Sequence, residues 1–577
     1  MTDDKRSKNE FIKEGSRQLR GTIAEGLADV ATGAISEDDS QLTKFHGTYL
    51  QDDRDVRGER AKKKLEKAYS FMIRVRLPGG VTTSKQWLQL DAIAGTYANH
   101  TLRLTTRQTF QFHGVIKSNM KRTMQAINAA ALDTLAACGD VNRNVLAASN
   151  PYLSKAHAAA HDLAVKISEH LLPKTGAYHE IWLDGKQVID ESGPAKNDEE
   201  PIYGVHYLPR KFKIVIAVPP SNDIDIYAHD LGYIAITDEK GKIAGWNVTV
   251  GGGMGMTHGE IDTFPRAADV MGFCTPEQAV DVAEKVVTVQ RDWGNRHSRK
   301  RARLKYTIED HGLGNFRAEV EKRLGYKLGE PRPFEFKSTG DVIGWEQGAD
   351  KKWHLTLFIE SGRIKDMPGW TLRTALREIA EMHPGGFVVT ANQNLIITNV
   401  TAKAKSKIEA LLKEHGIAIG TGLSGLRRNS MACVALPTCG LALAESERFM
   451  PELLTALEES LDKAGLKDDE IVIRMTGCPN GCARPYLAEI GLVGRNPGLY
   501  NLYLGAAFNG DRLNKLYAED VDKARIVRLL EPMFAHYAKE REEGEHFGDF
   551  AIRAGYVKAT TAGNRFHADL APLKAVS

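Results

Sequence analysis

Four of the six cysteines form two close pairs in the last quarter of the chain, Cys433 with Cys439 and Cys478 with Cys482. In a reducing cytosol, thiols grouped in this way are metal ligands or catalysts more often than disulfides. Structural zinc sites favour a C-x2–4-C pair with matching histidine or cysteine partners. The first pair here is more widely spaced and has no nearby histidine, so zinc fits poorly.

Both pairs lie in segments interrupted by glycine and proline, CVALPTCG at 433–440 and GCPNGC at 477–482. Irregular loops of this kind supply the four thiolates of iron–sulfur clusters, so the pattern predicts a [4Fe–4S] cluster. The alternative is that these cysteines are buried small hydrophobic residues, and two similar pairs make it weaker than one would. Cys138 and Cys274 have no close partner in the sequence, and we interpret them as ordinary thiols.

An internal repeat sets the expected architecture. Residues 102–115 and 387–400 align without a gap at an offset of 285 residues, and at the same offset Arg143-Asn144 meets Arg428-Asn429. The identities within the aligned segments are Thr105/Thr390, Gln108/Gln393 and Val115/Val400. A duplicated unit explains these matches better than chance.

The patterns around the two segments predict the same order of elements in both copies. The first copy is expected to hold a strand at 71–77, a helix at 84–98, a strand at 101–115 and a helix near 119–135. The second is expected to hold a strand at 354–359, a helix around 371–382, a strand at 387–399 and a helix at 405–413. Each copy continues into a longer α/β segment, with apolar strands at 213–216 and 470–474. An α+β protein with pseudo-twofold symmetry follows.

Basic residues gather near the repeat. Arg74 and Arg76 alternate on one expected strand, and Lys211 and Lys213 alternate on another, so each pair points to one face. Charged strand faces often only meet water, but several pairs close to the repeat favour an anion site. The glycine-rich segment 250–256 lacks the G-x-G-x-x-G pattern and is more typical of a plain glycine turn.

The composition limits the class of protein. A chain of 577 residues is expected to form three or four domain-sized units. Its 77 basic and 74 acidic residues leave a net charge of +3, which predicts neither a nucleic acid nor a membrane as partner. The polar N-terminus lacks the apolar core of a signal peptide and no apolar run is long enough to cross a bilayer, so we expect a cytoplasmic location. No dinucleotide or flavin fingerprint is present, which indicates that electrons come from another protein.

Four motifs together resemble the sirohaem-dependent sulfite and nitrite reductases: FMIRVRLPGG at 71–80, RLTTRQTFQFHG at 103–114, LPRKFK at 208–213 and RMTGCPNGCARP at 474–485. The resemblance extends through 51–55 and 290–295 to nearly the whole chain. It implies ferredoxin-like half-domains at 71–136 and 346–420, paired about the pseudo-twofold axis. It also implies a first sirohaem-binding α/β domain at 137–345, a second α/β domain carrying the cysteines at 421–577, and a partner-binding, partly mobile extension at 1–70.

The resemblance also implies a set of site residues. The four cysteines would hold the [4Fe–4S] cluster, and Cys482 would also be the axial ligand of the sirohaem iron. The substrate face of the haem would be lined by Arg74, Arg143, Lys211 and Lys213. The carboxylates and edge of the sirohaem would be met by Arg103, Thr105, Arg107, Gln111, His113, Arg303 and Asn480. A lone strand histidine is more often packed or hydrogen-bonded, so His113 is not expected to be an iron ligand.

The implied reaction is the six-electron reduction of sulfite to sulfide in assimilatory sulfate reduction and cysteine biosynthesis. The implied donor is a flavoprotein subunit that oxidises NADPH and carries FAD and FMN, although relatives with the same core use ferredoxin. One alternative is a sirohaem nitrite reductase that forms ammonia, in which the position of Lys213 is typically asparagine. Another, of a different class, is a non-catalytic protein in which the cysteines hold a structural metal cluster.

Overall fold

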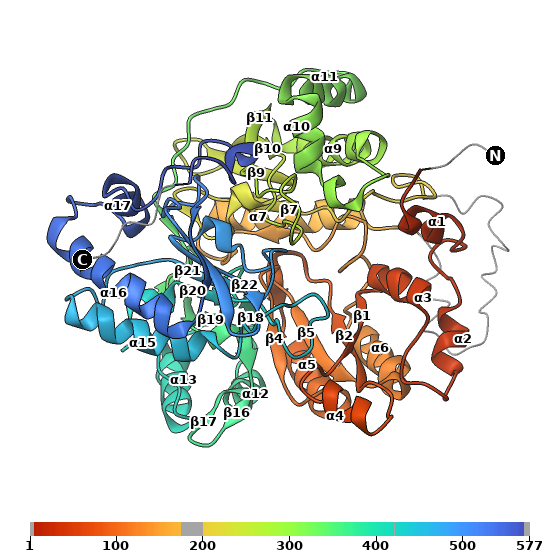
Figure 1. The fold of residues 1–577 in the computed structure, drawn as a ribbon, viewed down its shortest axis with the longest axis horizontal. Coiled ribbons are helices and arrows are strands. Elements are labelled where there is room, and N and C mark those ends of the chain that lie inside the picture. Colours follow the sequence, from red (N-terminus) through yellow and green to blue (C-terminus); the bar gives the residue numbers. More distant parts are fainter. Residues whose placement is uncertain (1–4, 175–199, 421, 571–577) are drawn as a thin grey trace.

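The computed structural model describes residues 5–174, 200–420 and 422–570 (Figure 1). Residues 1–4, at the start of the expected extension, lie outside the described residues. Within the described residues the chain forms four five-stranded sheets, two in the half-domains and two in the larger domains. Figure 1 places the first half-domain (red and orange) beside the second (green and teal), with the larger domains adjoining them.

The half-domain sheets are antiparallel and exchange short strands. The first has the order β1 (Thr48–Asp52), β2 (Tyr69–Arg74), β5 (Phe110–Val115), β4 (Leu102–Leu104) and β15 (Arg363–Ile364). The second has the order β13 (Gly344–Gln347), β14 (Trp353–Leu357), β19 (Leu395–Val400), β18 (Phe387–Val389) and β3 (Val81–Thr82). Because β15 pairs with β4 and β3 with β18, each half completes the sheet of the other.

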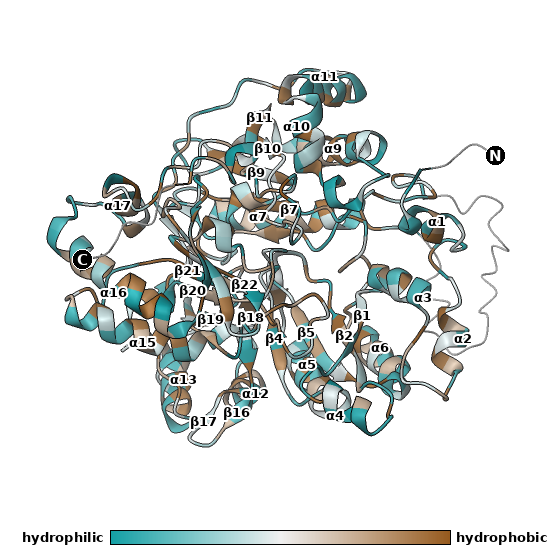
Figure 2. Ribbon diagram, in the orientation of Figure 1, coloured by the Kyte–Doolittle hydropathy of each residue, from teal (hydrophilic) through white to brown (hydrophobic). Residues whose placement is uncertain are grey.

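Four helices cover these sheets and share one apolar core with them: α5 (Ser84–Tyr97), α6 (Met120–Ala129), α12 (Leu372–Met382) and α13 (Ala402–Glu414). Helix α5 begins with a capping box. The Thr83 side chain accepts a hydrogen bond from Gln86 N, and the Gln86 side chain accepts one from Thr83 N. Its buried residues Trp87, Leu90 and Ala94 recur at helical spacing. Figure 2 shows hydrophilic residues on the outer turns of α13 and of α11 (Leu313–Leu324).

The two larger domains repeat one sheet topology. The first sheet runs β6 (Leu146–Ala147), β7 (Ile214–Ala217), β9 (Leu231–Thr237), β10 (Ile243–Val250) and β11 (Asp269–Cys274); the second runs β20 (Ser430–Ala432), β21 (Ile473–Thr476), β22 (Ile490–Asn496), β23 (Leu499–Leu504) and β24 (Lys515–Val521). In both, the first three strands are parallel and the last two antiparallel. The expected pseudo-twofold α+β architecture is therefore confirmed.

Helices surround these sheets. The first domain carries α7 (Lys155–His170), α9 (Ala279–Trp293), α10 (Leu304–His311) and α11, and the second carries α14 (Gly425–Arg428), α15 (Met450–Lys463), α16 (Lys523–Glu540) and α17 (Phe547–Arg553). Two short ladders, β8 (Ser221–Asn222) with β12 (Ser338–Thr339) and β16 (Asp366–Met367) with β17 (Trp370–Thr371), complete the pairing. No helix in the described ranges is long and apolar enough to cross a membrane.

The expected single strands at 101–115 and 387–399 are wrong, because each is a hairpin. Strand β4 turns into β5 at residues 105–109, where Thr105 N donates to Thr109 O at 2.9 Å and Gln108 adopts a φ of +50°. The second copy turns in the same way at Gln393, whose φ is +71°. Neither turn contains glycine or proline, so the alternating pattern of the sequence gives no sign of it.

The glutamines shared by the repeat hold the two kinds of domain together. Gln108 Nε2 donates to Ala147 O at 2.8 Å and its Oε1 accepts from Ala147 N at 3.0 Å, which caps the edge strand β6. Gln393 makes the same two bonds with Ala432 of β20, at 2.9 and 3.3 Å. The identity of these residues in both copies therefore has a structural cause.

Residues of the expected N-terminal extension pack against the first half. Helix α1 (Lys8–Glu14) buries two charges, and Lys13 Nζ lies 2.7 Å from Glu10 Oε1 and 3.7 Å from Asp140 Oδ2. Arg296 binds the other oxygen of Glu10 at 2.5 Å, so these buried charges are paired. Helices α2 (Ile23–Ala28), α3 (Glu37–Leu42) and α4 (Arg57–Lys62) follow. Glu10 is 0 % exposed, so this polar part of the chain is buried at that residue.

Candidate functional site

The cysteine loops leave one edge of a parallel sheet. Strands β20 and β21 are parallel neighbours, with Ala432 opposite Met475, so Cys433 and Cys478 follow strands that end side by side. Cys433 N donates to Met475 O at 3.2 Å, and Gly477 N lies 3.4 Å from Cys433 Sγ. The far end of the first loop returns to the second, because Leu443 N donates to Gly477 O at 2.7 Å. The two sequence pairs thus form one site.

All four thiols are electrostatic neighbours. Burial raises the pKa of Cys433, and the charges of Cys482, Cys478 and Cys439 raise it further. Burial is the largest cause, and the charge of Cys482 the next, of a pKa of Cys478 that is raised to about 12. Within the described residues, no three His, Cys, Asp or Glu side chains are arranged to hold a single metal ion. Four neighbouring cysteine thiols are the donor set by which proteins hold iron–sulfur clusters.

A row of polar side chains crosses the first half-domain sheet. Arg74 on β2, Gln111 on β5, Arg103 on β4 and Arg363 on β15 lie in register. Arg74 donates to Cys138 Sγ at 2.8 Å, and Gln111, with its amide oxygen turned toward Arg74, accepts from Nε at 3.1 Å.

Arg103 lies further along the row and is almost fully buried. Its Nε lies 3.0 Å from Glu447 Oε2, and Arg363 binds the same carboxylate at 2.6 Å. Burial lowers the pKa of Arg103 to about 10. This guanidinium therefore has a carboxylate partner within the chain.

The predicted lysines meet the thiol site. Lys211 and Lys213 flank the buried Phe212, whose N–H donates to Val141 O and whose C=O accepts from Arg143 N. In this extended segment the two lysine side chains point to the face opposite to that of Phe212. Burial places the pKa of Lys213 well below its usual range, and the charges of Arg107, Arg303 and Lys211 lower it further. The pKa of Lys211 is lowered in the same way, by burial and then by Arg210, Arg143 and Arg303. The charge of Cys482, an exposed thiol, acts in the opposite direction and raises the pKa of both lysines.

Arg107 lies in the β4–β5 turn and reaches the first α/β domain. Its Nη2 donates to the Asn144 and Ile214 carbonyls, while Nε is buried without a partner. Arg303 is paired with Asp230 at 2.7 and 3.0 Å. The Thr105 hydroxyl accepts from Arg107 N at 3.2 Å and so fixes the turn.

His113 is buried with its Nδ1 unpartnered and its Nε2 3.3 Å from the Gln111 side-chain amide. Burial places its pKa well below the usual range, so it is neutral. Buried polar atoms are nearly always bonded, so the bare Arg107 Nε and His113 Nδ1 fit a site built for a polar, carboxylate-bearing group.

The glycine-rich segment 250–256 contacts the second cysteine loop. Its interpretation as a plain glycine turn did not predict this contact. Met256 N donates to Pro479 O at 2.8 Å, and a Cβ on Gly255 would lie 3.2 Å from Asn480 O. Lys305 Nζ donates to Gly255 O at 2.6 Å from the other side. Asn480 Nδ2 lies 3.5 Å from Cys478 Sγ, as expected for a residue at the edge of the site. Glycine is needed because two backbones approach closely.

Three further groups were not found from the sequence. Asp225, buried at the centre of the molecule, binds Arg474 at 2.7 Å and also Arg484, two residues beyond Cys482. Cys138, interpreted as an ordinary thiol, lies between Arg74 and Tyr49. Arg210 is an electrostatic neighbour of Lys211. Only Arg210 had a sequence signal, since it lies inside the 208–213 motif.

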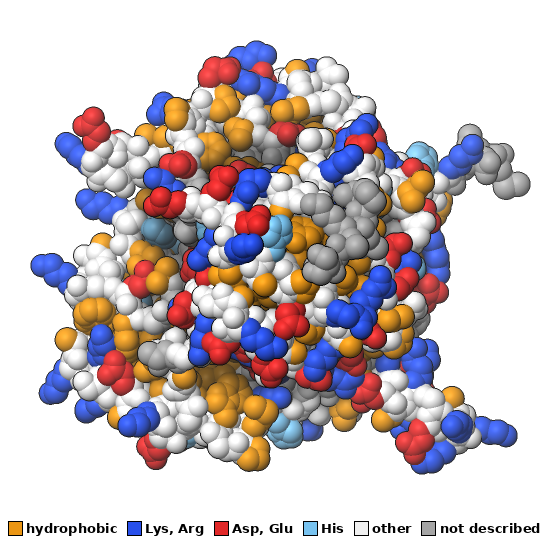
Figure 3. All heavy atoms as spheres, turned by 60° about the vertical axis from the view of Figure 1, so that its left-hand side comes forward, with side chains coloured by type: hydrophobic (Ala, Val, Ile, Leu, Met, Phe, Trp, Pro, Cys, Tyr) orange, Lys and Arg blue, Asp and Glu red, His pale blue; other side chains and the backbone are white. Residues whose placement is uncertain are grey.

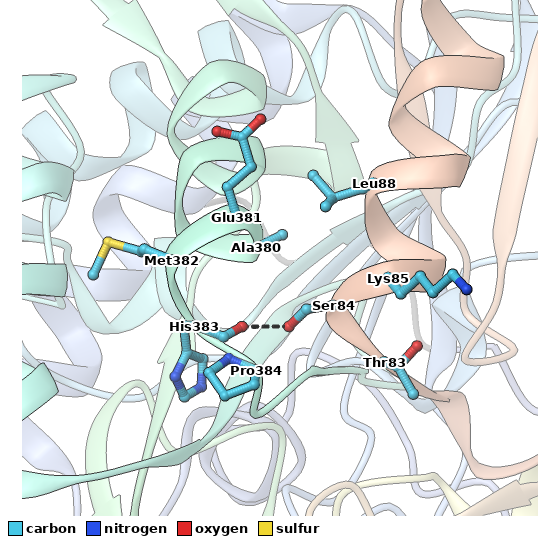
Figure 4. Close-up of a pocket in the computed structure, with 9 residues that line it drawn as sticks. All are labelled: Thr83, Ser84, Lys85, Leu88, Ala380, Glu381, Met382, His383 and Pro384. Carbon is cyan, nitrogen blue, oxygen red and sulfur yellow. Dashed lines mark hydrogen bonds between the residues drawn. The ribbon is translucent and has the colours of Figure 1, made fainter.

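A surface hollow between the half-domains is separate from this site. Thr83, Ser84 and Leu88 line it from α5 and its cap, and His383 and Pro384 line it from the end of α12 (Figure 4). The Ser84 hydroxyl bonds to His383 O at 2.5 Å across the hollow. None of the predicted site residues lines it.

Comparisons with known proteins agree with this geometry. The family model described as the nitrite/sulfite reductase ferredoxin-like half domain matches residues 63–130 and 346–415, and that of the nitrite and sulphite reductase 4Fe-4S domain matches residues 164–328. The latter range contains none of the four clustered cysteines, which lie in the second copy.

The similar proteins cover nearly the whole chain. A protein of Methylobacterium nodulans named sulfite reductase [NADPH] hemoprotein beta-component is 66 % identical over 99 % of this chain and 94 % of its own length. One of Geobacillus thermodenitrificans with the same name is 60 % identical over 97 % of both chains. The solved structure of the Mycobacterium tuberculosis NirA protein has the same fold, with a TM-score of 0.77 and 24 % identity over 95 % of this chain and 96 % of its own. The chain belongs to the nitrite and sulfite reductase family.

Proposed function

We propose that this chain catalyses the six-electron reduction of sulfite to sulfide, as the haemoprotein subunit of an assimilatory, NADPH-dependent sulfite reductase. The observation that carries the proposal is the meeting of four neighbouring thiols with a cluster of cations at Cys482. The curated relatives at 60–66 % identity, which bear the name sulfite reductase [NADPH] hemoprotein beta-component, support the same reaction.

The residues fit two resident groups. Cys433, Cys439, Cys478 and Cys482 would hold a [4Fe–4S] cluster, and Cys482, the exposed thiol beside the lysines, would also ligate the sirohaem iron. The sirohaem carboxylates and edge would be met by Arg103, Thr105, Arg107, Gln111, His113, Arg303 and Asn480. When bound, the coupled haem and cluster supply the electrons that take sulfur from the +4 to the −2 state.

The arginines and lysines of the site have different roles toward the substrate. The charges of Tyr49, Cys138 and Asp140 overcome the effect of burial and raise the pKa of Arg143, which therefore stays charged and suits anion binding. Arg74 lies on β2 and donates to Cys138 Sγ, whose charge also acts on Arg143. Burial and the neighbouring cations lower the pKa of Lys211 and of Lys213, which makes each Nζ a readier proton donor than an ordinary lysine. Cations aimed at the oxygens also stabilise the charge that develops as each oxygen leaves as water.

We also propose that the electrons come from a flavoprotein alpha subunit that oxidises NADPH through FAD and FMN, in the cytoplasm. The beta-component name of the relatives supports a partner subunit. In this proposal the extension at 1–70 contributes to the partner surface, and the domains divide at 71–136, 137–345, 346–420 and 421–577.

The first experiment is an absorption spectrum of the purified protein, with iron and labile sulfide measured on the same sample. Sulfite and reduced viologen are then added, and sulfide is measured. Sirohaem bands with sulfide production are expected. A protein that contains zinc, or a cluster without tetrapyrrole, would refute the proposal. Faster turnover of nitrite than of sulfite would assign the chain to the nitrite-reducing members of the family. Replacing viologen by NADPH and the flavoprotein subunit tests the donor separately.

A further inference from the structure

The segment that follows strand β1 reaches the first cysteine loop. Residues 51–55 read QDDRD, and β1 ends at Asp52. Arg54 N then donates to Pro437 O at 3.2 Å. Its guanidinium donates through Nη1 to Ala442 O at 2.6 Å and to Cys439 O at 3.3 Å. One arginine from the N-terminal region therefore bonds to three carbonyls of the Cys439 loop.

The residues on both sides fix Arg54 in this position. Asp52 accepts from Arg57 Nε at 2.8 Å and from Nη2 at 2.7 Å, a bidentate pair that anchors the start of the segment. Asp55 pairs with Arg448 at 2.6 and 3.2 Å, which anchors its end to the chain just beyond the cysteine loop. The backbone around Arg54 is thus held at two points, and little freedom remains to be lost when the guanidinium binds the loop.

The loop needs an external support because its tip faces solvent. Gly440 is exposed, and Leu441, two residues after Cys439, is 68 % exposed. Among the described residues no carboxylate forms a salt bridge with Arg54, whereas its neighbour Arg57 is paired with Asp52. The Arg54 charge is therefore not neutralised by a neighbour, and its bonds direct it at the peptide groups around Cys439.

We propose that Arg54 is a positioning residue for the iron–sulfur cluster, which closes the Cys439 loop and raises the reduction potential of the cluster. This inference rests on the proposed function, because it assumes that the four cysteines hold a [4Fe–4S] cluster. Reduction adds one negative charge to the cluster, and a fixed cation nearby favours the reduced form. Net charge, hydrogen bonding and solvent exposure are the main determinants of cluster potentials, and Arg54 supplies a fixed positive charge beside the Cys439 loop.

The test compares Arg54→Gln and Arg54→Lys with wild type in the full-length, cofactor-loaded protein. Lys62→Gln, which removes one exposed positive charge from helix α4, is the matched control. Iron and labile sulfide per chain are measured first, and the cluster potential is then measured by redox titration followed by electron paramagnetic resonance. Arg54→Gln is expected to titrate at a more negative potential than wild type, Arg54→Lys close to wild type, and Lys62→Gln at the wild-type value.

Each result decides the inference. An Arg54→Gln protein with a full cluster at the wild-type potential would overturn it. Loss of the cluster from Arg54→Gln but not from Arg54→Lys would support it, since the retained charge rescues the loop. Loss from both variants would overturn the charge effect, because the lysine keeps the charge. A wild-type protein without any cluster signal would instead refute the proposed function, so the two failures are distinguishable.

Discussion

Cys482 has a property that the other three thiols of the site do not share. It is exposed, and its charge acts on both Lys211 and Lys213, whereas Cys478 is buried. Cys482→Ser is therefore expected to abolish sulfite reduction, with a fall of more than about 100-fold, because ligand loss should cost at least as much as the loss of outer-shell partners. Sulfide production with reduced viologen and the haem spectrum measure the effect. Cys274→Ala, which changes a buried thiol away from the site, is the control and should stay active.

Lys213 is the residue that we expect to favour sulfite over nitrite. Its charge is surrounded by other cations and lies beside Cys482, where the substrate anion would bind. Lys213→Asn is expected to lower kcat/KM for sulfite by about 100-fold, the usual effect of removing one group that stabilises developing charge. The ratio of nitrite to sulfite turnover is expected to rise. Parallel assays of both anions measure this change, and an unchanged ratio would show that Lys213 does not determine specificity.

At the scale of single residues, the sequence predicted the side chains of the site but not the side chains that pair with them. The four cysteines were predicted as ligands because they form two close pairs and because glycine and proline residues interrupt the segments around them. Arg74 and Arg76 were expected to act together, but β2 ends at Arg74, and Arg76 forms a bidentate pair with Asp133. Arg103 and Arg303 likewise have carboxylate partners, Glu447 and Asp230, which lie far away in the sequence. Local patterns cannot show which cation a distant carboxylate neutralises.

At the scale of elements, the β4–β5 hairpin is held by a side chain rather than by its turn sequence. Gln108→Ala would leave the buried N–H and C=O of Ala147 without partners. Each unpaired buried group costs about 1–3 kcal/mol, so for the two groups we expect the free energy of unfolding to fall by about 2–6 kcal/mol. Urea denaturation measures this change. The exposed Gln347→Ala should change stability by less than about 0.5 kcal/mol. Similar values for both variants would contradict the role of Gln108.

The hairpins also show which local structure the sequence did not predict. The helices at 84–98 and 371–382 were predicted within a few residues, because their apolar residues recur at helical spacing. The turns at Gln108 and Gln393 were missed, because the positive φ of each is imposed by bonds from its side chain to a strand in another domain. Such bonds exist only after the domains have packed, so the local sequence does not encode the break.

A buried carboxyl group at the junction of the domains makes stability depend on pH. Burial is the largest effect, and together with the charge of Asp341 it raises the pKa of Asp223 from its ordinary value of 3.8 to about 7. The folded protein therefore binds an extra proton between these values. This contribution to stability is complete below pH 3.8 and is lost as the pH rises through about 7.

Asp223→Asn should remove this dependence, because the amide is neutral throughout and its oxygen can still accept from Ser149 N. Between pH 5 and pH 8 the wild type is expected to lose a few kcal/mol of unfolding free energy relative to the variant. Urea denaturation at both values measures the difference, with the exposed Asp262→Asn as control. A constant difference between wild type and Asp223→Asn would refute this assignment.

At the scale of the whole molecule, each half contributes different residues to one site. The repeated sheets and exchanged strands make a symmetric frame, yet the clustered cysteines come only from the second copy and Lys211 and Lys213 only from the first. The site therefore exists only where the halves meet. Figure 3 shows Lys and Arg interspersed with Asp and Glu on the outer face that it presents.

Asp225 and Arg484 form a buried ion pair between the two halves. The two residues occupy equivalent positions in the two copies, each before a short 3-10 helix and each with a positive φ, of +50° and +53°. Asp225 also binds Arg474 at 2.7 Å and is 1 % exposed. Because Arg484 follows Cys482 by two residues, this carboxylate fixes the second cysteine loop against the domain that carries the lysines.

Asp225→Asn is expected to lower the free energy of unfolding by about 3–5 kcal/mol, because it leaves two buried guanidinium groups without a charge partner. The same variant should bind less iron and labile sulfide per chain, since the loop that carries Cys482 loses its anchor. Asp310→Asn removes an exposed partner of Arg301 at 2.7 Å and should cost less than about 1 kcal/mol. Urea denaturation and metal analysis of both variants measure these effects. If Asp225→Asn were as mild as Asp310→Asn and kept a full cluster, the halves would have to be held by the exchanged strands and the glutamine contacts alone.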